Sequence, residues 1–81
     1  MDCRVLRMSE LLPGATGEVV SLKMVGSIKK RLLDLGLIEG SRVTCMCQSL
    51  WGDPSAYLIC GAVIALRRAD CDQVFLREVH T

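Results

Sequence analysis

The first segment with a clear alternation of apolar and polar side chains runs from Thr16 to Met24. Val20, Leu22 and Met24 share one face in this pattern, with polar residues between them. A period of two is typical of a strand that buries one face and exposes the other. The sequence therefore predicts a half-buried strand in this segment.

Beyond this strand the hydrophobic period changes to that of a helix. Ile28, Leu32 and Leu35 recur at i, i+4 and i+7, which predicts an amphipathic helix of about three turns. Ser27 is predicted to cap the first turn with its side-chain oxygen. Gly36 is predicted to adopt the left-handed conformation that ends the helix.

Four later segments are predicted as strands. They are Arg42–Gln48, Ala56–Cys60, Ala62–Leu66 and Val74–Val79, and the middle two form a hairpin around Gly61. Neither arm of the hairpin alternates with polar residues, so both of its faces are apolar. One face must then be covered by the helix, by a second copy of the chain or by a partner.

Five short strands, with one helix inserted after the first, predict a mainly β fold. A small SH3-like antiparallel barrel suits these elements, because closure limits the exposed edges of short strands. A helix packed on an open antiparallel sheet uses the same elements and is the alternative. The 81 residues are expected to form a single domain, 1–81. A polar turn is predicted at Arg67–Asp72.

The composition narrows the classes of function. Apolar residues make up 51% and charged residues 23%, which excludes intrinsic disorder. Three aromatic residues and a net charge of +1 argue against nucleic-acid binding. The uncharged apolar stretch Ala56–Leu66 is too short to span a bilayer, and the N-terminus lacks an apolar leader. The expected location is cytoplasmic, with no direct insertion into a membrane.

The five cysteines are expected to be reduced thiols. Their number is odd, no Cys-x-x-Cys pair occurs, and His80 is the one histidine, so zinc-ligand spacing is absent. Cys45 and Cys47 lie two apart in a predicted strand, which would place both thiols on one face, where they could jointly bind a soft metal ion. The alternative is that both are small buried hydrophobic residues. We expect no cofactor, with these two thiols as the weak candidates for a transition metal.

No catalytic arrangement is evident, and an enzyme is not expected. A catalytic triad would have to use His80, beside the C-terminal residue, and no phosphate-binding loop motif occurs. The domain is therefore expected to act by binding another polypeptide and shifting its equilibrium. The candidate contact residues are Leu50, Trp51, Tyr57, Arg67 and Arg68. Trp and Tyr are favoured interface anchors, although Trp51 has the alternative role of plugging one end of the barrel.

Several motifs follow one another in a characteristic order. They are Leu12-Pro13-Gly14 with Gly17, the run Leu32-Leu33-Asp34-Leu35-Gly36-Leu37-Ile38-Glu39-Gly40, then Gly52-Asp53-Pro54, and Gly61 followed by Ile64-Ala65-Leu66-Arg67-Arg68. In this combination the chain resembles the FeoA family of ferrous iron transport proteins, over roughly Met8 to Val79. The resemblance implies an SH3-like cytoplasmic domain that assists FeoB, a GTP-driven membrane transporter of ferrous iron.

The same resemblance leaves a second function open. A similar module forms the C-terminal domain of metal-dependent repressors of the diphtheria-toxin-regulator type, which implies a metal-binding or iron-sensing module as the alternative. The apolar stretch Ala56–Leu66 and the five cysteines depart from the family pattern. Self-association into a homo-oligomer is therefore a further expectation for this chain.

Overall fold

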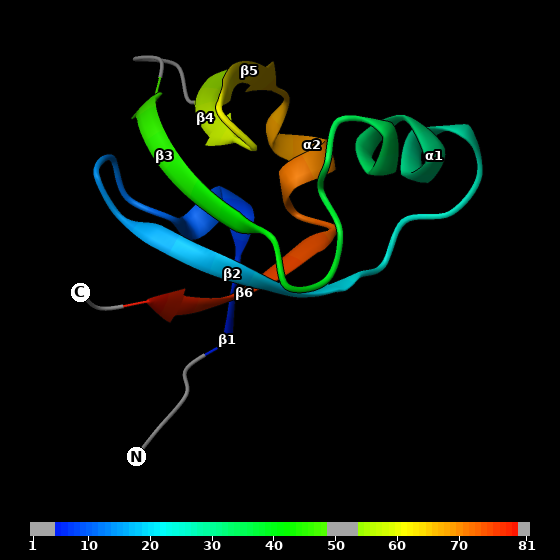
Figure 1. The fold of residues 1–81 in the computed structure, drawn as a ribbon, viewed down its shortest axis with the longest axis horizontal. Helices are drawn as coiled ribbons and strands as arrows, with labels where there is room; N and C mark the ends of the chain where they lie inside the picture. Colours follow the sequence, from blue (N-terminus) through cyan, green and yellow to red (C-terminus); the bar gives the residue numbers. More distant parts are fainter. Residues whose placement is uncertain (1–4, 49–53, 80–81) are drawn as a thin grey trace.

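The computed structural model describes residues 5–48 and 54–79 of the chain. These residues form one antiparallel sheet of six strands in the order β1-β6-β2-β3-β4-β5, with two α-helices and one 3-10 turn (Figure 1). The elements are β1 (Val5–Arg7), η1 (Met8–Glu10), β2 (Thr16–Leu22), α1 (Ser27–Asp34), β3 (Arg42–Gln48), β4 (Ser55–Ile59), β5 (Ala62–Leu66), α2 (Arg68–Cys71) and β6 (Val74–Val79).

The predicted class of fold is confirmed: the chain is mainly β and antiparallel, with a helix between the first long strand and the next. The described residues contain six strands rather than about five, because β1 adds three residues that pair with β6. The segment predicted as a polar turn, Arg67–Asp72, instead contains α2, which buries Cys71. No helix in the described part of the chain has the length and apolar character needed to cross a bilayer.

The helix α1 ends as predicted but begins differently. Gly36 has φ +97°, and its N–H donates to the carbonyl of Leu33 at 3.0 Å while the N–H of Leu37 donates to that of Leu32 at 2.9 Å. This pair of bonds is a Schellman motif, in which two buried leucines, Leu32 and Leu37, close the helix end. The predicted cap by Ser27 is wrong: the N-cap is Gly26, and α1 spans 8 residues, about two turns.

Two irregularities in the sheet change which side chains face the core. The register shifts between Val19 and Ser21 in β2 and between Cys45 and Cys47 in β3. An extra residue in one strand moves the side chains on its two sides onto different faces. The predicted buried face of β2 is therefore wrong at Val20: Val19 is the buried residue, with 2% of its surface exposed.

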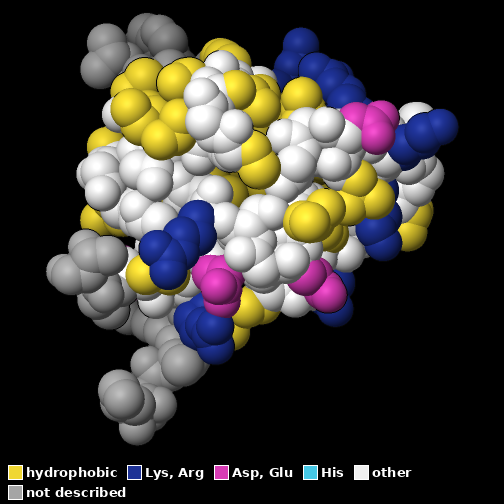
Figure 2. Space-filling model, viewed as in Figure 1, with side chains coloured by type: hydrophobic (Ala, Val, Ile, Leu, Met, Phe, Trp, Pro, Cys, Tyr) yellow, Lys and Arg dark blue, Asp and Glu magenta, His cyan; other side chains and the backbone are white. Residues whose placement is uncertain are grey.

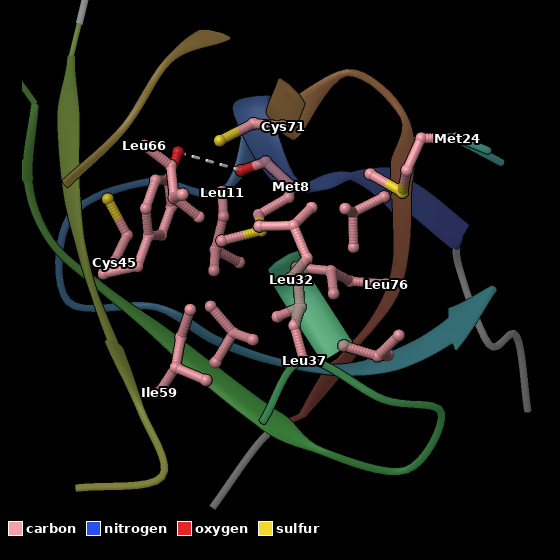
Figure 3. Packing of buried hydrophobic residues seen from close by; sticks show 14 residues of the cluster. Met8, Leu11, Met24, Leu32, Leu37, Cys45, Ile59, Leu66, Cys71 and Leu76 are labelled. Atoms are coloured by element: carbon pink, nitrogen blue, oxygen red, sulfur yellow. Dashed lines mark hydrogen bonds between the residues drawn. The ribbon is translucent and has the colours of Figure 1, made fainter. Parts of the chain in front are cut away.

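The core lies between the curved sheet and a cover formed by α1, α2 and η1 (Figure 1). Leu32 of α1 points into this space beside Leu37 and Leu76 (Figure 3). The buried side chains are Met8, Leu11, Val19, Met24, Leu32, Leu37, Val43, Cys45, Tyr57, Ile59, Leu66, Cys71, Val74 and Leu76. They come from every element except β1, so the domain has one continuous core.

Candidate partner-binding surface

The hairpin of β4 and β5 has one covered face and one uncovered face. Leu58 is paired with Val63 and Ala56 with Ala65, so these four side chains lie together on the outer side of the sheet. Val63 is 61% exposed, and Ala65 is also exposed. Hydrophobic side chains gather over β4 and β5 in the space-filling view (Figure 2). We call Ala56, Leu58, Val63 and Ala65 the outer hairpin face.

The turn of the hairpin fixes this arrangement. Cys60 and Gly61 form a two-residue connection with φ of 51° and 82°, and both positive values are those of a type I′ turn. This turn pairs Ile59 with Ala62 and so sets the register of the whole hairpin. The prediction of a tight hairpin at Gly61 is confirmed. Its inner face holds Ile59, which is fully buried.

Tyr57 does not belong to the exposed surface, and its predicted role as a contact residue is wrong. The side chain is 1% exposed, and its hydroxyl donates a hydrogen bond of 3.3 Å to the carbonyl of Met8. Burial raises the pKa of the Tyr57 hydroxyl, and the nearby Cys71 thiol adds to this rise. The sequence showed which residues alternate along β4 but not which face is inside.

The other predicted contact residues have different outcomes. Leu50 and Trp51 lie outside the described residues. Arg67 and Arg68 are exposed where β5 ends and α2 begins. The two arginines therefore lie beyond Leu66, at the end of β5 that is remote from the Cys60–Gly61 turn. The expected partner contacts of these four residues stay predictions.

The two candidate metal-binding thiols lie on different faces, so their predicted common face is wrong. The bulge in β3 pairs Cys45 with Tyr57 but Cys47 with Ala56, and Tyr57 and Ala56 point to opposite sides of β4. Cys45 is fully buried and Cys47 is exposed. Burial, and secondarily the charge of Cys47, raises the pKa of the Cys45 thiol. Among residues 5–48 and 54–79, no three His, Cys, Asp or Glu side chains form a group that could hold a metal ion.

A second surface feature was not predicted: a groove between α1, α2 and the end of β5. It has a volume of about 590 Å³, and a neighbouring hollow of about 370 Å³ shares three of its lining residues, Ile28, Ala69 and Asp70. We call the two together the helix groove. Its lining also includes Lys23, Val25, Arg31, Ala65, Leu66 and Arg67. The helical period of the sequence indicated Ile28, but the groove depends on α2, which was predicted as a turn.

The chain is similar to known proteins over most of its length. The family model of the FeoA domain matches residues 6–78. A fusion of Fe(2+) transport protein A with the Fe(2+) transporter FeoB, from Porphyromonas gingivalis, is 30% identical over 69 residues. The match covers 85% of this chain but only 8% of the fusion protein.

Solved structures agree on the fold. The FeoA protein of Chlorobium tepidum superposes with a TM-score of 0.87 at 27% identity, covering 93% of this chain and 71% of that one. The FeoA of Stenotrophomonas maltophilia, described as an SH3 domain protein and solved with zinc, gives 0.79 at 24% identity and covers 88% of each chain. A manganese-dependent transcriptional repressor gives 0.84 at 13% identity, covering 93% of this chain and 41% of the repressor. The SH3-like prediction is confirmed.

Proposed function

The chain belongs to the FeoA family of ferrous iron transport, and from this membership we propose that it is a cytoplasmic accessory protein of a FeoB-type transporter. In this role it is not an enzyme. It binds the GTPase portion of the transporter and shifts the balance between that portion's conformations, since a ligand moves an equilibrium by its difference in affinity for two states.

The fusion protein of P. gingivalis is the observation that carries the choice of partner. There, a segment similar to this chain is joined covalently to the transporter FeoB. A covalent link turns the meeting of two modules into an intramolecular event with a high effective concentration. A fusion of this kind supports a working contact between the two parts. In the present chain, we expect the same contact to form between separate polypeptides.

The outer hairpin face supplies the surface for this contact. Leu58 and Val63 pair across two strands, Ala56 and Ala65 pair beside them, and no polar side chain interrupts the four. β5 is also the last strand of the sheet, so its backbone edge is next to this face. Apolar side chains at the centre of an interface, surrounded by polar groups, are typical of protein–protein contacts.

The repressor-like alternative has weaker support. The similarity to the manganese-dependent repressor is one of fold, at 13% identity. A sensor that used Cys45 and Cys47 together would need both thiols on one side of the sheet, and the bulge at Met46 separates them. We therefore retain the accessory role as the proposal.

Titration of the transporter's soluble GTPase portion into this protein, with and without GTP, tests the proposal. We expect saturable binding that is at least about tenfold weaker for Val63→Glu, since a carboxylate on the outer hairpin face would be desolvated on binding. The matched control is Val5→Glu, because Val5 is 55% exposed on β1 at the opposite edge of the sheet. Absence of binding by the unmodified protein in every nucleotide state would refute the proposal.

A further inference from the structure

The helix groove exists because α1 buries only part of its apolar stripe. Leu32 is 2% exposed, whereas Ile28, one turn earlier on the same helical face, is 49% exposed. Ile28 lines both hollows of the groove, together with Ala69 and Asp70 of α2. The apolar stripe of α1 thus packs on the core at Leu32 and lines the open groove at Ile28.

The apolar floor of the groove extends in two directions from Ile28. Toward the sheet it includes Ala65 and Leu66 at the end of β5. Toward the connection between β2 and α1 it includes Val25, whose side chain is 81% exposed. Together the two hollows have room for several side chains of another polypeptide, and their size falls within the range of ligand-binding clefts.

Charged side chains around this floor are mostly positive. Of the described residues that line it, Lys23, Arg31 and Arg67 are cationic and Asp70 is the one carboxylate. Three cations against one carboxylate leave an excess of two positive charges, although the whole chain carries a net charge of only +1. The groove is therefore a place where an otherwise nearly neutral domain would attract acidic groups.

We propose that the helix groove is a second docking site, which takes a short segment of the transporter's GTPase portion that carries apolar side chains next to Asp or Glu. The apolar side chains cover Ile28 and Val25, and the carboxylates lie beside Arg31 and Arg67. The choice of the transporter as the source of this segment rests on the proposed function. The preference for an acidic and apolar segment rests on the groove alone.

The chemistry of the groove can be tested without any partner. Octanoate carries an alkyl chain with a carboxylate, and octyltrimethylammonium carries the same chain with a positive charge. In amide NMR titrations of the full chain, we expect octanoate to shift the signals of Ile28 and Ala69, and the cation to shift them much less. Equal shifts by the two probes, or octanoate shifts only at the outer hairpin face, would overturn the proposal.

Variants of α1 test the docking of the segment itself. Ile28→Glu is expected to weaken binding of the GTPase portion by about tenfold or more, because it puts a carboxylate where an apolar side chain docks. Leu33→Glu is the matched control, since Leu33 is a 38% exposed leucine of the same helix that does not line the groove. Circular dichroism checks that both variants fold. Arg31→Glu, at an exposed residue of the groove, gives a second test, with Lys30→Glu as its control.

The outcomes separate this proposal from the proposed function. If the GTPase portion binds and loses affinity with Val63→Glu but not with Ile28→Glu or Arg31→Glu, the accessory role stands and the groove proposal is refuted. If octanoate binds in the groove and the GTPase portion does not bind at all, the accessory role fails, and so does the transporter as the source of the segment. If both groove variants weaken binding and their controls do not, the groove is established as a docking site.

Discussion

The thiol of Cys60 lies against the helix end at Gly36, with its Sγ 3.6 Å from the Gly36 carbonyl oxygen. A Cβ placed on Gly36 would come within 2.6 Å of this sulfur. The contact joins the turn of the β4–β5 hairpin to the end of α1, two segments that are 24 residues apart. Position 36 must therefore be glycine for two reasons: its positive φ, and the sulfur above it.

Substitution of this glycine should destabilise the protein. Gly36→Ala is expected to lower the free energy of unfolding by about 1 to 2 kcal/mol from the left-handed conformation alone, with an added steric cost from Cys60. Urea unfolding followed by circular dichroism measures the change. The control is Gly40→Ala, because Gly40 has φ +91° and a Cβ there would meet nothing within 4 Å.

A third variant separates the two costs. In a Cys60→Ala background the sulfur is absent and only the Cβ of residue 60, 3.3 Å from the added methyl group, remains nearby, so the penalty of Gly36→Ala should fall toward that of Gly40→Ala. An unchanged penalty would mean that Cys60 turns away without cost and that only the backbone conformation matters.

Turns and helix ends were predictable where they require a backbone conformation that one residue type, glycine, adopts most easily. Gly36 follows the last residue of the helical stripe, and its freedom at positive φ marks the helix end. Gly61 between two apolar runs marks the hairpin in the same way. Such signals are contained in a few neighbouring residues, so they can be read without knowledge of the rest of the chain.

The faces of the strands were less predictable, because the two bulges carry no signal in composition. One extra residue near Val20 puts Val19 in the core, and another at Met46 places Cys45 and Cys47 on opposite sides. The side of β4 that is buried depends on this pairing with β3, so the inward position of Tyr57 depends on it too. The helix groove depends on α2, a helix of 4 residues that is too short to show a period.

The bulge in β3 predicts different reactivity for neighbouring cysteines. A Cys3→Ser variant leaves four cysteines to compare. The exposed Cys47 and Cys60 should react rapidly with an aromatic disulfide reagent, whereas the buried Cys45 and Cys71 should be protected. Attack on the buried pair requires local opening, so we expect it to be slower by on the order of 100-fold or more. Peptide mapping after brief labelling identifies the modified residues. Labelling of Cys45 at the rate of Cys47 would contradict the assigned faces.

Gly17 in β2 has little room for a side chain, although the sequence pattern places it in a motif rather than in the core. A Cβ on Gly17 would lie 3.0 Å from both Cβ and Cδ1 of the buried Leu76 on β6. Gly17→Ala is therefore expected to cost about 1 to 3 kcal/mol of unfolding free energy. Combined with Leu76→Ala, it should cost less than the two single changes added together. Strict additivity would show that the crowding is absent.

The buried hydroxyl of Tyr57 and the buried thiol of Cys45 predict a loss of stability at alkaline pH. Burial raises the pKa of Tyr57 above its ordinary value of 10.0 and that of Cys45 above 9.0. Above those ordinary values the unfolded chain releases protons that the folded chain retains, so a rise in pH favours the unfolded state. The stability that each group contributes is fully present below its ordinary pKa and is lost as the pH rises toward the folded value.

Urea unfolding between about pH 8 and about pH 11 measures this loss, which is at most about 1.4 kcal/mol per pH unit for each group. Cys45→Ala should remove the decline that starts near 9.0, and Tyr57→Phe the decline that starts near 10.0. Tyr57→Phe also loses the hydrogen bond to the Met8 carbonyl, and this loss lowers stability by about 1 kcal/mol at every pH, so it adds no pH dependence of its own. If its slope above about pH 10 matches that of the unmodified protein, the tyrosine does not couple ionisation to folding, and its hydroxyl must be accessible to water.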